Sequence, residues 1–372
     1  MVDHVDILPG SATDWERLFG EVNDPLALLG ENFDGIRAAD QNPPPSFMPW
    51  LVWQYGLGEL TPFLPNLYDL VRDGILWQRE RGTPASIRRG LDWIGYDAEI
   101  EEEPSRRLRW NRFQLLLDRV RDADVPDLSR IAGITQLSVP ARSKFARGFR
   151  GYDIRAGETS FGKTSGCLTS DHSGVYLPGI APKWSFGRSY SADVTLGETA
   201  LTDLGVWIEP VGTSDVWADA DYLWDGATFP WSVPGEQSRR ATMAEGVVEQ
   251  SAWVRFRRAG GAIVGHARAI ARPVKQVSSG GAYTIAATQW SPDPADPFAV
   301  HVLATSGFGD GAGETATTMS VVFGATLATG IPPGRLWIGP GHLVGGVEIA
   351  QTPVSIPFGL SVRERTQFIL RL

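Results

Sequence analysis

The chain has 372 residues, a formal net charge of -9, 42 glycines, 26 prolines and a single cysteine. This length predicts two or three domains, and one cysteine excludes both an intramolecular disulfide framework and a zinc site built from cysteines. No apolar run reaches transmembrane length and the N-terminus lacks the regions of a signal peptide, so we expect a protein made in a cytoplasm and no membrane partner.

The charge is unevenly distributed along the chain. Residues 1–100 hold 16 acidic and 7 basic side chains, whereas residues 105–150 hold 11 basic and 4 acidic ones. Such asymmetry steers association between proteins or between domains. A solvated helix face would produce the same pattern. A nucleic-acid partner is not expected, because the basic stretch lacks an aromatic-rich binding sheet and the whole chain is acidic.

The first hundred residues are predicted to be helical. Ser11 and Asp14 have the spacing of a capping box before an apolar run. Residues 25–39, 65–82 and 83–95 carry apolar side chains at helical spacing, and the prolines at 43–45 interrupt the pattern. Each of these helices has one apolar stripe, which a bundle or a complex must cover.

An aromatic cluster and a helical corner are the most informative motifs. The cluster is Pro-Trp-Leu-Val-Trp at residues 49–53, and the corner is Gly-Thr-Pro at residues 82–84. In the corner, the glycine suits a left-handed helix end, the threonine an N-cap and the proline a first helical turn. Neither motif is chemically reactive. The candidate packing or partner-binding anchors are Trp50, Leu51, Trp53, Arg79, Gly82, Thr83 and Pro84.

The excess of tryptophan, fourteen residues in all, indicates aromatic cores or large surfaces that partners cover. We expect Trp50 and Trp53 to be buried anchors. If Trp50 lies in a core, its replacement by alanine should cost about 3–5 kcal/mol.

Beyond an acidic run at residues 101–103, the sequence pattern changes from mainly helical to mainly β-strand. A strand is predicted at 110–118, a helix at 127–137, and short strands separated by glycine, serine and proline from residue 152 to the end. The expected fold class is α+β and multidomain, with a helical domain followed by antiparallel, sandwich-like β domains. The predicted segments are a helical domain at 1–100, a mixed α/β module at 105–195, a Trp-rich β domain at 196–277 and a C-terminal β domain at 282–372.

Three patterns suggest chemistry, and each has a simpler explanation. Residues 157–164 fit the phosphate-loop pattern up to Lys163 and Thr164, but no periodic helix follows them, so a β-turn is the better account. The glycines and carboxylates of residues 307–314 resemble a calcium-binding turn, although one isolated copy favours a mobile surface loop. Asp219, Asp221 and Asp225 among tryptophans suggest a sugar-contacting cleft or an ordinary β-surface. We therefore expect no catalytic residue, no cofactor and no metal site.

Residues 47–95, with Pro49, Trp50, Leu51, Trp53, Arg79, Gly82, Thr83, Pro84 and Gly90, resemble the tail protein I family of contractile-tailed phages. The resemblance implies a non-enzymatic baseplate wedge subunit in the virion tail, or in a related contractile particle. Its implied partners are two copies of a larger baseplate assembly protein, the central hub and a tail fibre. The alternative is a carbohydrate- or receptor-contacting tail protein that acts through the Trp-rich β region.

Overall fold

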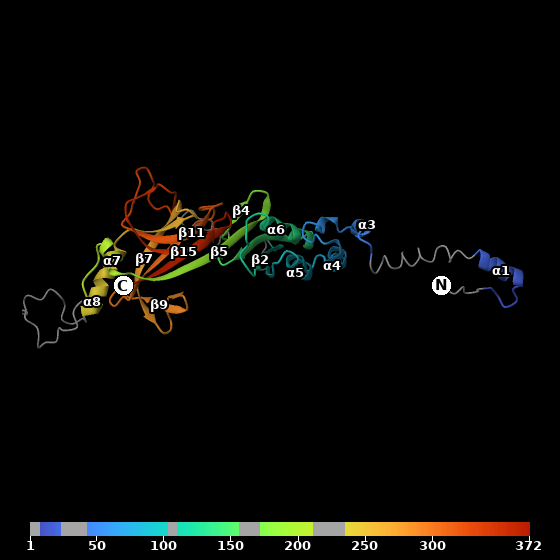
Figure 1. The fold of residues 1–372 in the computed structure, drawn as a ribbon, viewed down its shortest axis with the longest axis horizontal. Helices are drawn as coiled ribbons and strands as arrows, with labels where there is room; N and C mark the ends of the chain where they lie inside the picture. The colour runs from blue at the N-terminus through green and yellow to red at the C-terminus, as the bar shows by residue number, and fades with distance from the viewer. Residues whose placement is uncertain (1–7, 24–42, 103–109, 156–171, 211–234) are drawn as a thin grey trace, which may run out of the picture. The chain divides into compact units, whose positions relative to one another are not determined.

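A computed structural model of the chain describes residues 8–23, 43–102, 110–155, 172–210 and 235–372 (Figure 1). The chain divides into two compact units. Unit 1 consists of Met1–Gly95 with Leu137–Pro140, and unit 2 of Tyr96–Gln136 with Ala141–Leu372. Strands from all three segments predicted beyond residue 105 belong to unit 2.

Unit 1 is helical, as the sequence predicts. Its described helices are α1 (Asp14–Val22), α3 (Met48–Gln54), the short 3-10 helix η1 (Gly58–Leu60), α4 (Leu67–Glu80) and α5 (Pro84–Asp92). The predicted helix at 25–39 lies outside the described residues.

The helices of unit 1 pack through a few large side chains. Leu57, fully buried, fills the space above Gly74 of α4, where a Cβ would lie 3.0 Å from a methyl group of the leucine. Trp77, on the same helix, is buried and donates its indole N–H to Ser138 Oγ at 3.0 Å. Gly74 therefore permits close approach, and the tryptophan holds the segment 137–140 to α4.

The capping residue of α1 differs from the one that the sequence suggested. Thr13 is the N-cap: its hydroxyl accepts the Glu16 N–H, and the Glu16 carboxylate accepts the Thr13 N–H at 2.7 Å. The predicted cap, Ser11, lies two residues earlier. The spacing rule applies equally to both positions, and the Glu16 carboxylate decides between them because only Thr13 stands three residues before it.

Unit 2 contains three further helices and sixteen strands among the described residues. The helices are α6 (Asp127–Ser138, whose last two residues belong to unit 1), α7 (Glu198–Asp203) and α8 (Gly235–Val248). The first strands are β1 (Ala98–Glu102), β2 (Arg112–Leu117), β3 (Lys144–Arg150), β4 (Val175–Leu177), β5 (Ile180–Thr195), β6 (Ala252–Arg257), β7 (Ile263–Val277) and β8 (Tyr283–Ile285). The remaining ones are β9 (Thr288–Pro292), β10 (Ala299–Thr305), β11 (Thr315–Phe323), β12 (Thr326–Leu327), β13 (Trp337–Ile338), β14 (Leu343–Val344), β15 (Val347–Pro357) and β16 (Val362–Arg371).

Most of these strands form one mixed sheet. Its main path runs β1-β2-β3-β5-β16-β10-β7-β6-β11-β15, within a fourteen-stranded sheet, and β12 pairs separately with β14. The α+β class is confirmed. The pairing differs from the expected antiparallel sandwich, because β2–β3, β3–β5 and β5–β16 are parallel pairs.

The parallel pairs have a simple topological origin. The strands β2 and β3 are joined through α6, and parallel neighbours require such a crossover whereas antiparallel ones need only a turn. The long strand β5 then pairs with β3 on one side and with β16, near the C-terminus, on the other. The C-terminal strand thereby joins the first part of unit 2 to the last.

Two helices lie in the segment that the sequence predicted as a Trp-rich β domain. They are α7 and α8, and α8 buries only Met243, Ala244 and Val247. Its apolar side chains are too few to produce a visible helical period, so the prediction missed it.

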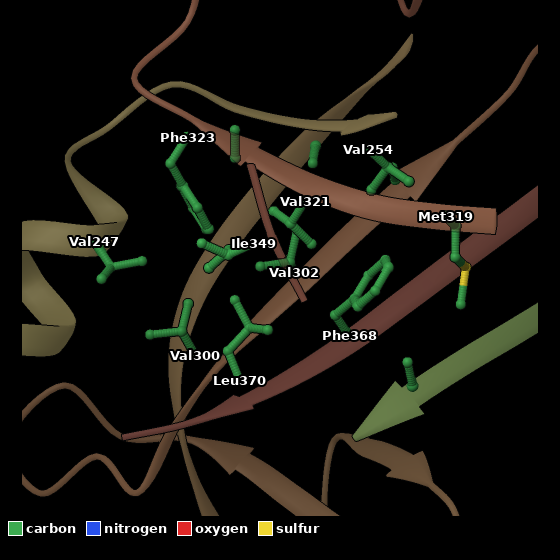
Figure 2. Close-up of a cluster of buried hydrophobic side chains, with 14 of the residues drawn as sticks. Val247, Val254, Val300, Val302, Met319, Val321, Phe323, Ile349, Phe368 and Leu370 are labelled. Atoms are coloured by element: carbon green, nitrogen blue, oxygen red, sulfur yellow. The ribbon is translucent and has the colours of Figure 1, made fainter. Parts of the chain in front are cut away.

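The largest core of unit 2 lies on one face of the curved sheet (Figure 2). Alternate residues along each strand point into it, as a period of two requires. The labelled side chains come from α8 and five strands: Val247, Val254, Val300, Val302, Met319, Val321, Phe323, Ile349, Phe368 and Leu370. This core fixes the register of the strands, since a shift by one residue would expose the whole set.

Candidate functional site

The aromatic cluster of α3 is exposed. Trp50 is 65% and Trp53 79% solvent-accessible, while Met48 and Val52 on the other side of the helix are buried and Leu51 is half-buried. The expectation that the two tryptophans are buried in a core is therefore corrected for this chain. The helix is short, and its buried side chains occupy the face opposite the tryptophans, which are left for solvent or a partner.

The Gly-Thr-Pro corner has the predicted backbone. Gly82 adopts φ +87°, and Pro84 begins α5. The threonine occupies the N-cap position, but its hydroxyl donates to Glu80 O at 2.7 Å and makes no cap hydrogen bond. The Gly82 N–H donates to Ser138 O at 2.9 Å, so the corner also holds segment 137–140. Arg79, by contrast, is exposed.

The helix α1 buries none of its residues. Trp15, Leu18, Phe19 and Val22 are between 57% and 77% exposed and recur at i, i+3, i+4 and i+7, which places them on one face. The rings of Trp15 and Phe19 stack at 5.2 Å. An apolar face of this size on a capped helix is typical of a surface that another protein covers.

Comparison with known families identifies the region that contains these exposed faces. Residues 8–142 match the family described as Phage tail protein (Tail_P2_I). Residues 8–142 are therefore assigned to the phage tail protein I family, which confirms the resemblance seen in the sequence. No curated protein matches the chain. Membership of a phage tail family implies that the matched region interacts with other tail components. The match includes both α1 and α3, together with the Gly-Thr-Pro corner.

Several residues suggested by the sequence lie outside the described residues. They are the phosphate-loop pattern at 157–164 with Lys163, the aspartates Asp219, Asp221 and Asp225 with the tryptophans around them, and Cys167.

The glycine-rich turn at residues 307–314 is described, and its two carboxylates have separate partners. Asp310 accepts the Gly307 N–H, and burial raises the pKa of its carboxyl. Glu314 forms an ion pair with Arg258 at 3.3 Å. Within the described part of the chain, no group of three or more histidine, cysteine, aspartate or glutamate side chains is placed to hold a metal ion. The same described residues contain no helix that is long and apolar enough to cross a membrane.

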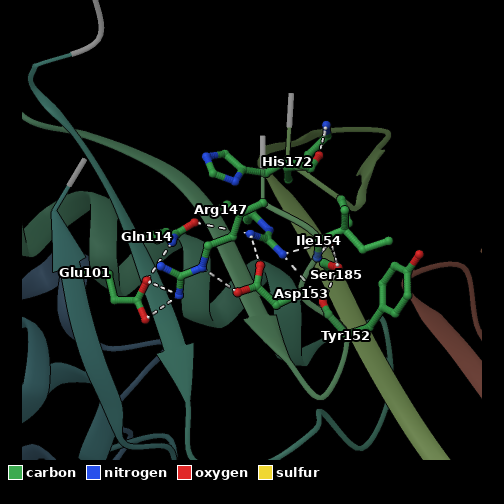
Figure 3. A network of polar contacts seen from close by, with 11 residues as sticks. Glu101, Gln114, Arg147, Tyr152, Asp153, Ile154, His172 and Ser185 are labelled. Atoms are coloured by element: carbon green, nitrogen blue, oxygen red, sulfur yellow. Dashed lines mark hydrogen bonds and ion pairs between the residues drawn. The ribbon is translucent and has the colours of Figure 1, made fainter. Parts of the chain in front are cut away.

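A polar network in unit 2 was not predicted (Figure 3). Buried Arg147 of β3 pairs with Asp153 at 2.8 Å and donates to Ser173 Oγ at 2.9 Å. Arg155 pairs with Glu101 of β1 at 2.9 Å. Burial opposes ionisation of Asp153, but hydrogen bonds from the two arginines lower the pKa of its carboxyl.

This network ties residues 152–155 and 172–173 to the sheet. Ser185 of β5 donates to Tyr152 O at 2.7 Å, and Lys183 donates to His172 O at 2.8 Å. Its arginines and carboxylates neutralise one another, and the hydroxyls of Ser173 and Ser185 complete the contacts that hold these segments in place. No sequence pattern predicts this network, because Glu101, Arg147 and Asp153 belong to separate segments with no shared spacing.

Proposed function

We propose that this phage tail protein is a wedge subunit of the baseplate of a contractile particle. It assembles with two copies of a larger baseplate assembly protein around a helical bundle and connects them to the central hub. The C-terminal sheet supports tail-fibre attachment. In this proposal the protein is made in the host cytoplasm, acts in the virion tail, binds no cofactor, nucleic acid or membrane, and catalyses no reaction.

The observation that carries the proposal is the unburied apolar face of α1 within the matched region. Four large apolar side chains, which are Trp15, Leu18, Phe19 and Val22, share one helical face with no buried neighbour in the helix. Amphipathic helices gain most of their stability from packing of that face. A helix bundle with partner chains would supply this packing.

The face of α3 extends the same argument. Trp50 and Trp53 stand one turn apart, and Phe47 is 40% exposed one turn earlier. Tryptophan is enriched at the energetically dominant centres of protein interfaces, where it becomes fully desolvated. The anchor residues of α3 are therefore proposed to act between chains, whereas Gly82 acts within unit 1 through its bond to Ser138.

Wedge subunits of this kind act by repacking. We propose that contraction changes which surfaces the exposed helices contact, and that two alternative packings replace a chemical step as the mechanism. The hydrogen-bonded sheet of unit 2 is suited to remain rigid during such a change, because a well-packed core does not deform continuously.

The proposal is tested by counting the chain in purified particles. Quantitative mass spectrometry against the sheath and tube proteins should give a constant low number, about six copies for a ring of six wedges. Absence of the chain from particles, or a copy number that varies with the preparation, would contradict the wedge role.

A double variant, Trp50→Ala with Trp53→Ala, tests the surface itself. We expect the chain to fold, since both side chains are exposed, and to be lost from particles when it replaces the natural protein. The matched control is Tyr176→Ala, because Tyr176 is 66% exposed and lies beyond the matched region. Normal incorporation of the double variant would exclude α3 as an assembly surface.

A further inference from the structure

The N-terminal ends of β2 and β3 bring several cations together. Arg112 and Lys144 are direct partners in the parallel register of these two strands. Asn111 donates its side-chain amide to Arg142 O at 2.9 Å, and the Lys144 N–H donates to Asn111 O at 2.8 Å. Backbone pairing thus holds the cationic residues on adjacent segments. We refer to Trp110, Arg112, Arg142 and Lys144 as the basic end.

The positive charge of the basic end is uncompensated within the described residues. Like charges directly opposite each other on paired strands are destabilising. Among the described side chains, none forms an ion pair with the cations of the basic end, although Arg147, further along β3, pairs with Asp153 at 2.8 Å. Among the described side chains, the buried cation of β3 is therefore neutralised by a carboxylate, whereas the cations of the basic end are not.

An exposed aromatic ring accompanies these cations. Trp110 is 64% exposed, and both Arg142 and Lys144 are exposed as well. A tryptophan next to arginine and lysine is typical of the centre of an interface, where the ring supplies apolar area and the cations supply orientation. The surrounding sequence, residues 105–150, carries 11 basic and 4 acidic side chains, so its field attracts anions over a longer range.

We propose that the basic end binds an acidic segment of a partner protein. Carboxylates of that segment pair with Arg112, Arg142 and Lys144, and an apolar side chain of the same segment covers Trp110. This inference goes beyond the wedge proposal, because it assigns a surface outside the helical faces and states the chemistry of what binds there. Nucleic acid fits less well, since the basic end offers one exposed ring and the chain as a whole carries a charge of -9.

The test uses the purified full chain and a fluorescently labelled peptide of about twelve residues, rich in Asp and Glu with two Leu, at low ionic strength. The variant Arg142→Glu with Lys144→Glu reverses two charges of the basic end. The control, Arg268→Glu with Arg335→Glu, reverses two other exposed arginines of unit 2, which the bond from the Arg268 N–H to Leu336 O holds close together. Both variants change the net charge equally, so general electrostatic attraction would affect them alike.

We expect the basic-end variant to bind the peptide about tenfold more weakly and the control to change by less than about twofold. A carbodiimide, which joins a lysine amine to a carboxylate that contacts it, should link the peptide to Lys144. Equal losses in the two variants, no binding by the natural chain, or tighter binding of a single-stranded oligonucleotide of equal charge would each overturn the proposal.

A second measurement separates this inference from the wedge role. In particles that contain the chain, Lys144 should be protected from acetylation relative to the free chain. If the chain is present at its constant copy number but Lys144 is modified equally in both states, the basic end is uncovered and this inference fails while the wedge role stands. If the chain is absent from particles, the wedge role fails and the peptide result alone decides the inference.

Discussion

The tryptophans of α3 and those of the large sheet have opposite environments. Trp50 and Trp53 are mostly exposed, whereas Trp184 of β5 and Trp290 of β9 are completely buried. The same residue type is therefore buried in one region of the chain and exposed in another. The number of tryptophans alone does not distinguish a hydrophobic core from a surface that binds a partner protein.

The difference follows from what covers the face on which each tryptophan lies. Trp184 stands on β5, which has β3, β4 and β16 as partners, and its ring contacts Phe145 and Phe186 at 5.8 and 6.0 Å. The short helix α3 buries one face through Met48 and Val52 and exposes the other. Strand pairing brings Phe145 of β3 beside Trp184, and Phe186 of β5 follows two residues later on the same face, so the ring is enclosed by its own chain.

Truncation of a buried and of an exposed tryptophan should change stability by very different amounts. Trp184→Ala should lower the free energy of unfolding by about 3–5 kcal/mol, because a large buried ring is replaced by a cavity. Trp53→Ala should change it by less than about 0.5 kcal/mol, since the side chain has little to lose in the isolated chain. Urea denaturation of the full chain, followed by circular dichroism, measures both. Comparable losses in the two variants would mean that α3 is packed within the chain after all.

The sequence predicted those elements whose signal is local. The helix at Leu67–Glu80 lies within the predicted residues 65–82, and the strand at Arg112–Leu117 lies within the predicted residues 110–118. The left-handed Gly82 was also predictable, because a glycine between two helices is a common end signal.

The sequence could not predict which strands pair. The parallel neighbours β5 and β16 are separated by more than 160 residues, and nothing in either strand identifies the other. The exposure of Trp50 was equally inaccessible, because helical spacing shows that a face is apolar but not whether the same chain covers it. The network around Arg147 was equally inaccessible to prediction, since it also includes Ser173 and Glu101, which are far from Arg147 in the chain.

The dependence of stability on pH should reveal a carboxyl group that the sheet buries. Burial raises the pKa of Glu364 to about 7, against the opposing attraction of Arg188 and Arg121, and Arg188 lies 3.1 Å from its carboxylate. The folded pKa is above that of the unfolded chain, so the native state binds more protons between about pH 4.5 and pH 7. The contribution of this group to stability therefore falls as pH rises through that range, by up to about 3 kcal/mol.

Glu364→Gln should remove this dependence. Measured by urea denaturation, the stability of the variant relative to the natural chain should rise between about pH 4.5 and pH 8.

Glu348→Gln should show the opposite dependence of stability on pH. Burial opposes ionisation of Glu348, but hydrogen bonds from Arg257 and Ser320 and the charge of Arg255 lower its pKa to about 2. Its contribution is present above about pH 4.5 and lost as pH falls toward 2, so that variant should approach the natural chain only in acid. The same direction of change in both variants would contradict this account.

A small and local loss of stability is expected in α1, a helix that buries none of its residues. Thr13→Ala removes the hydroxyl that accepts the Glu16 N–H and should destabilise the helix by about 1 kcal/mol. Because α1 contributes nothing to either core, the loss should appear as about fivefold faster amide exchange within residues 14–22, with no change in the urea midpoint of the sheet. Ser11→Ala is the matched control, since the sequence pattern alone made Ser11 the cap. Faster amide exchange in Ser11→Ala but not in Thr13→Ala would make Ser11 the N-cap of α1. A shifted urea midpoint in Thr13→Ala would show that α1 packs on the rest of the chain, so that its apolar face is not free for a partner protein.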